Sequence, residues 1–210
     1  MGESFKNVIK SIVEKNPEPL YNRGAIFIED FEDRKKERPK SQEFQEAFPD
    51  LYDYLSQKES AKKFKVGIIH LDGIGALSRE LASSGKNPLQ IALTLRKMLY
   101  DGLIDIAKKM KEQPESELGQ IDFLTAASRF VTIDNIVEKL GFKSFNIDNE
   151  AAKFSDVSHK RNLQTYDLLK KDNKVSEKVV KKIEEEPKPA KIVLITKQNL
   201  LDLIKKNDQI

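Results

Sequence analysis

Hydrophobic positions along this chain recur at two spacings, and the two spacings predict helices and strands in alternation. Apolar residues three or four positions apart are typical of a helix that buries one side, whereas short alternating or continuous apolar runs are typical of strands. The predicted helices cover residues 3–15, 41–57, 88–111, 132–140 and 197–206. Ser41 and Asn87 are the expected N-caps, and Pro49 bends the second helix or divides it in two.

The predicted strands are shorter and richer in Val, Ile and Phe. They cover residues 24–30, 63–75, 121–126, 142–147 and 191–196. The stretch "KFKVGIIHLDGIG" at 63–75 is the strongest of them, because the continuous apolar run from Val66 to Leu71 suits a strand that is buried on both faces. The alternation of strands and helices predicts an α/β fold of three layers, with a mixed central sheet and helices on both faces.

A single hydrophobic core suits the length and composition of the chain, which has 210 residues of which 39% are hydrophobic. Residues 1–147 are predicted to form the α/β core with its N-terminal helices, and residues 191–210 the closing strand and helix of the same domain. Between them, residues 148–190 are predicted to be a charged insertion or linker. Few apolar residues are spread among many charges there, and "KKIEEEPKPA" is typical of a linker.

Charge and cysteine usage exclude several classes of function. The 37 Lys and Arg residues nearly balance the 34 Asp and Glu residues, so charge alone indicates no nucleic-acid partner. The absence of cysteine excludes disulfides, thiolate zinc sites and cysteine nucleophiles, and two distant histidines predict no metal site. No apolar run approaches the roughly 18 residues that a membrane helix needs. We therefore expect a soluble, cytoplasmic protein, with signal-independent secretion left open.

The strongest candidate for a binding site is the stretch "SSGKNPLQ" at 83–90, which comprises a loop and the first turn of the predicted long helix. A helix that starts after a buried strand presents free backbone N–H groups and the positive end of its dipole at the carboxyl edge of the sheet, where an anion binds. The residues predicted to bind a phosphate-bearing cofactor are Ser83, Ser84, Gly85, Lys86, Leu89 and Gln90. The alternative interpretation is a capped helix after an ordinary loop, because the loop matches neither a Walker loop nor a dinucleotide fingerprint.

His70 and Asp72 are the candidate catalytic residues. They stand two positions apart near the end of the strongest predicted strand, so both side chains are expected on one side of the sheet. A histidine beside a carboxylate can act as a base near neutral pH. The structural alternative is that His70 is a hydrogen-bonded core residue and that Asp72 begins a turn.

The order of strand, loop, long helix, strand and short helix, followed by "EKLGF" at 138–142, resembles the GNAT superfamily of N-acyltransferases. The resemblance covers about residues 63–147. It implies acetyl-CoA or another acyl-CoA as cofactor, with the pyrophosphate on backbone N–H groups of the loop before the long helix. It also implies an amine acceptor on a small molecule or a protein.

Two positions depart from the family's pattern. The family's pyrophosphate loop has an Arg or Gln followed by two spaced glycines, whereas "ASSGKNP" has a single glycine, and Val137 stands where the family commonly has a tyrosine as general acid. The sequence thus predicts an acyl-CoA-dependent N-acyltransferase-like protein that either retains turnover or is catalytically degenerate. The alternative is a non-catalytic protein-interaction module, an effector or adaptor, that meets its partner through charged helical segments in 30–60 and 150–190.

Overall fold

A computed structural model describes most of the chain. The described residues are 20–23, 26–30, 41–56, 61–70, 72–128, 138–147, 155–185 and 191–207. The predicted helix at 3–15 and the larger part of the one at 132–140 lie outside these residues.

Six strands of the described residues form one mixed, open sheet. In their order across the sheet they are β1 (Tyr21–Arg23), β2 (Ile26–Asp30), β3 (Val66–His70), β4 (Phe123–Ser128), β6 (Lys191–Thr196) and β5 (Lys143–Asn146). The two central strands β3 and β4 are parallel, and every other neighbouring pair is antiparallel.

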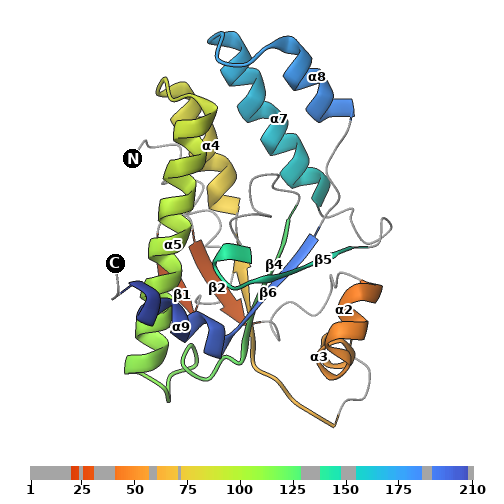
Figure 1. Ribbon diagram of the computed structural model, residues 1–210, viewed down its shortest axis with the longest axis vertical. Helices are drawn as coiled ribbons and strands as arrows, with labels where there is room; N and C mark the ends of the chain where they lie inside the picture. The colour runs from red at the N-terminus through yellow and green to blue at the C-terminus, as the bar shows by residue number, and fades with distance from the viewer. Residues whose placement is uncertain are drawn as a thin grey trace.

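Seven helices of the described residues surround the sheet. They are α2 (Gln42–Ala47), α3 (Pro49–Leu55), α4 (Asp72–Ser83), α5 (Pro88–Glu112), α7 (Ser155–Lys171), α8 (Glu177–Glu185) and α9 (Lys197–Asn207). Figure 1 shows α5 and α9 on one side of the sheet and α2 and α3 on the other, while α4, α7 and α8 lie beyond one end of the strands. The predicted α/β fold, with a mixed sheet and helices on both faces, is confirmed.

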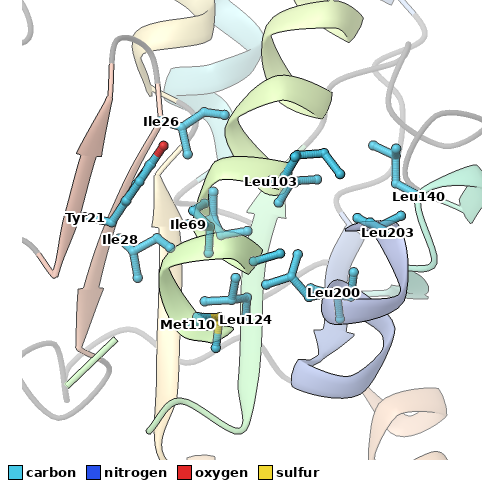
Figure 2. Packing of buried hydrophobic residues seen from close by; sticks show 14 of the residues in the cluster. Tyr21, Ile26, Ile28, Ile69, Leu103, Met110, Leu124, Leu140, Leu200 and Leu203 are labelled. Atoms are coloured by element: carbon cyan, nitrogen blue, oxygen red, sulfur yellow. The ribbon is translucent and has the colours of Figure 1, made fainter. Parts of the chain in front are cut away.

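The larger core lies between the sheet and the helices α5 and α9. Leu124 of β4 is 1% exposed and packs in one cluster with Leu103 of α5 and Leu200 of α9, which are both fully buried. Figure 2 shows these side chains converging from the three elements. Because side chains alternate along a strand, the neighbour Phe123 belongs to the opposite face.

The second core is aromatic and lies under α2 and α3. The ring of Phe44, which is 1% exposed, has its centroid 5.3 Å from that of Phe145 on β5 and 5.9 Å from that of Phe48. Ser41 caps α2 as predicted, since its hydroxyl accepts a hydrogen bond from the Phe44 amide at 3.2 Å. The chain also divides into two helices at Pro49, as expected.

Helix α4 is an element that the sequence pattern did not predict. The stretch 63–75 was expected to be one strand, but β3 ends at His70 and α4 begins at Asp72. The first turn of α4 contains two glycines, which have low helix propensity. For this reason the sequence pattern does not predict a helix there. Burial explains why the helix forms, because Ile74 and Leu77 are both 6% exposed and stand at helical spacing.

The segment predicted as a charged insertion or linker contains α7 and α8. It stands between β5 and β6, which are direct neighbours in the sheet, so in topology it is an insertion. The first part of the stretch interpreted as a linker is helical, since α8 continues to Glu185.

A carboxylate ties α2 to the edge strand β5. Glu43 accepts hydrogen bonds from the backbone N–H of Asn146 at 3.1 Å and from its side-chain amide at 3.0 Å. These bonds favour the charged form, so they lower the pKa of Glu43 from its ordinary value of 4.5, with a smaller contribution from Lys191. The contact also satisfies a backbone donor at the open edge of the sheet.

We expect Glu43 to make stability depend on pH in the acid range. Its pKa is lower in the folded than in the unfolded chain, so its contribution is present above pH 4.5 and is lost as the pH falls through the lower, folded value. Urea unfolding from about pH 6 to about pH 3 should show the wild type losing stability relative to Glu43→Gln. Glu46→Gln on the same helix is the control, and an equal effect of both substitutions would contradict the assignment.

Candidate functional site

The predicted phosphate-binding loop is a turn between two helices. It joins the end of α4 to the start of α5, so it does not follow a strand. Gly85 ends α4 in the left-handed conformation at φ +89°, where a side chain would be strained. The amide of Gly85 donates to the Ala82 carbonyl and that of Lys86 to the Leu81 carbonyl, both at 3.1 Å. These bonds close the C-terminus of α4 in the usual way.

Side chains of the first turn of α5 and of its N-cap form hydrogen bonds with backbone N–H groups of that turn. The side-chain oxygen of Asn87 accepts a hydrogen bond from the backbone N–H of Gln90 at 3.0 Å. The side-chain oxygen of Gln90 accepts one from the backbone N–H of Asn87 at 2.9 Å. This is a capping box, with Pro88 in the first turn. The prediction of a bare N–H group at Gln90 is therefore wrong, and the alternative of a capped helix is confirmed.

The turn also lies away from the sheet. The twelve residues of α4 separate it from β3, a distance of about 18 Å along a helix axis. Figure 1 shows the turn at the far end of α4, beside the end of α7. A Cβ atom placed on Gly85 would lie 3.8 Å from Lys174 Nζ, in the turn between α7 and α8. The prediction that this loop stands at the carboxyl edge of the sheet is wrong, because α4 intervenes.

The remaining predicted ligands of this loop have ordinary surroundings. Ser84 donates its hydroxyl to the Leu81 carbonyl at 2.9 Å, which uses it within the turn. Ser83 is exposed and Lys86 is half-buried. Leu89 has 67% of its surface exposed, so its side chain contributes little to the packing of α5.

We expect Asn87 to act on stability without any ligand. Replacing an N-cap Asn by Ala removes one of the paired bonds and should lower the free energy of unfolding by about 1 kcal/mol. Urea unfolding of Asn87→Ala measures this loss, and Gln90→Ala should show part of it because it removes the reciprocal bond. Unchanged stability in Asn87→Ala would contradict the cap.

His70 and Asp72 do not share a strand. His70 is the last residue of β3, lies opposite Phe27 of β2 and is 9% exposed. Asp72 is the first residue of α4, and its side chain lies outside the described residues. The expectation that both side chains point to one side of the same strand is wrong, because the strand has ended before Asp72. The structure places His70 at the junction of β3 and α4.

The parallel pair β3–β4 separates at this junction. The two strands pair only at Val66 with Phe123, Gly67 with Leu124, and Ile68 with Thr125. Beyond these pairs, β3 continues to His70 beside β2, and β4 continues to Ser128 beside β6. Among the described strand pairs, the carboxyl ends of β3 and β4 are therefore paired with β2 and β6 and not with each other. We call this place the β3–β4 fork.

Helix α4 begins at the β3–β4 fork. Its first turn contains Gly73 and Gly75, and Gly75 is buried. A helix start at the carboxyl edge of a sheet presents backbone N–H groups and the positive end of the helix dipole there. Sequence reasoning assigned this property to α5 and missed α4. The signal that could have found it is "GIG", two glycines separated by one residue directly after the strongest strand.

Neither a metal site nor a membrane helix occurs in the part of the chain that the structure describes. No group of three His, Asp or Glu residues there could hold a metal ion. Among the described helices, none combines the length and the apolar character that a membrane span requires. Comparison with protein-family models, with curated proteins and with solved structures gives no match to this chain.

Proposed function

We propose that this chain is an acyl-CoA-dependent N-acyltransferase-like protein whose cofactor site is the β3–β4 fork. The observation that carries the proposal is that pairing of the two parallel strands ends after three residue pairs, at the place where α4 begins. Open parallel strand ends beside a helix start are the place where α/β proteins bind ligands with phosphate groups.

The chemistry of a pyrophosphate suits the first turn of α4. Backbone N–H groups there can donate to phosphate oxygens, and glycine lets the backbone approach such a group closely. The GNAT pattern has an Arg or Gln followed by two spaced glycines, and here His70 precedes Gly73 and Gly75. Strand β3, which pairs in parallel with β4, leads into α4. The fork therefore takes the role that the resemblance assigned to residues 83–90.

His70 is the residue we propose as the base. It stands at the end of β3, next to the fork, and is buried apart from 9% of its surface. An imidazole titrates near neutral pH, so it can accept a proton from the amine that attacks the acyl carbonyl. Catalysis would otherwise consist of holding amine and thioester together, because proximity accounts for much of the rate of such reactions.

We expect acetyl-CoA to stabilise the protein through the fork and not through the α4–α5 turn. At a ligand concentration 100-fold above the dissociation constant, binding to the folded state alone adds about 2.7 kcal/mol to the free energy of unfolding. Gly73→Glu should abolish the shift in melting temperature, since it adds a negative charge where the pyrophosphate binds. Lys86→Glu is the matched control and should keep the shift.

The outcomes of this experiment separate the alternatives. If Lys86→Glu loses the shift in melting temperature and Gly73→Glu keeps it, the acetyl-CoA site lies at residues 83–90. Absence of a shift in the wild type, with acetyl-CoA and with longer acyl-CoA, would overturn the enzyme proposal. Circular dichroism of each variant without ligand shows whether it is folded.

A second candidate function, the non-catalytic interaction module, is favoured by apolar side chains in solvent. Leu89 and Leu93 stand one turn apart on α5 with 67% and 54% of their surfaces exposed, and Val179 on α8 is 42% exposed. Large apolar side chains that remain in solvent at neighbouring helix positions are typical of contact surfaces for other proteins. A folded protein whose melting temperature does not change with acyl-CoA would favour this function.

A further inference from the structure

The insertion formed by α7 and α8 takes no part in the sheet. The strands on either side of it, β5 and β6, pair directly with each other, for example at Phe145 and Ile192. Antiparallel neighbours of this kind can be joined by a two-residue turn, so the sheet does not require the two helices. Figure 1 shows them beyond the end of the strands, alongside α4. We call α7 and α8 together the arm.

The arm is held to the body by a small apolar cluster of its own. Leu169 of α7, which is 2% exposed, packs with Ala82 of α4 and Ile91 of α5, which are 0% and 6% exposed. Half-buried side chains surround these three, namely Leu81, Leu95, Tyr166, Leu168 and Val175. The cluster is separate from the large core under α5 and α9. The side chains of the body that release of the arm would expose in this cluster belong to α4 and α5 and not to the sheet.

Within the arm, α7 and α8 are joined by a short turn with contacts of its own. Lys170 and Glu177 form an ion pair at 2.9 Å across the turn, and this bond lowers the pKa of Glu177. Asn173 occupies the left-handed region at φ 55°, which asparagine tolerates better than most residues. The Lys174 amide then donates to the Leu169 carbonyl at 2.8 Å. The two helices are thus expected to leave α4 as one unit.

We propose that the arm is a releasable element that leaves α4 as a unit while the sheet stays folded. Release would break the contacts of α7 with α4 and β4, and the packing of Leu169 on Ile91 of α5. The released state opens an apolar surface on α4 and on the first half of α5, formed by Leu81, Ala82, Ile91 and Leu95. Because α4 also starts the β3–β4 fork, the arm can regulate whatever binds there. The release itself does not depend on acyl-CoA.

Native-state hydrogen exchange on the full chain tests the proposal. An isolated helix of this length is marginal in water, so amides of α7 exchange once the arm is released. In the wild type we expect residues 163–185 to exchange together, and faster than residues 123–128 and 191–196. Low concentrations of guanidinium should change this exchange little, since partial opening exposes less surface than global unfolding.

Two matched Leu→Ala variants make the test specific. Leu169→Ala should speed exchange in residues 163–185 by about tenfold or more and leave residues 123–128 within about twofold of the wild type. Leu103→Ala, in the large core, should speed exchange of the sheet. Equal exchange of arm and sheet in the wild type would overturn the proposal. So would a Leu169→Ala variant in which arm and sheet become faster by the same factor.

Discussion

Burial of α5 against the sheet is the contact on which the rest of this structure depends. The C-terminal half of the helix places Leu103 and Ile106, both fully buried, over the central strands. Its N-terminal half continues past the end of the sheet and contributes Ile91 to the cluster that holds the arm. Since one helix joins the two clusters, the position of α4 and the arm is set by a helix anchored in the core.

Most of the fold could be predicted because its signals are local. Helices α2 and α5 have N-caps, Ser41 and Asn87, whose side-chain chemistry is visible in the sequence, and the structure shows both caps formed. The buried strands β3, β4 and β6 are apolar enough to be recognised by composition. Helix α4 was missed for the opposite reason, because its burial against α5 and against α7, which is distant in the sequence, overrides the low propensity of its glycines.

The error at the candidate site follows from the same helix. Asn, Gly, Lys and Pro before an apolar helix favour both a capped turn and an anion site, since both use the amides at a helix start. Only the element that precedes the loop distinguishes the two, and that element is α4 and not a strand. Asn87 and Gln90 satisfy each other's amides, so the turn needs no ligand to be stable. The glycines after β3 stand where the prediction had placed the end of a strand.

The separation of the two apolar clusters bears on how the β3–β4 fork could work. The strand side of the fork is held by strand pairing, since His70 lies opposite Phe27 of β2 and Thr125 lies opposite Leu194 of β6. On its helix side it depends on α4, whose far end packs in the smaller cluster with Leu169. The release that we propose for the arm would remove contacts from α4 and from β4, two of the elements that meet at the fork. The insertion contributes no strand pairing, so its movement would leave the hydrogen bonds of the sheet in place.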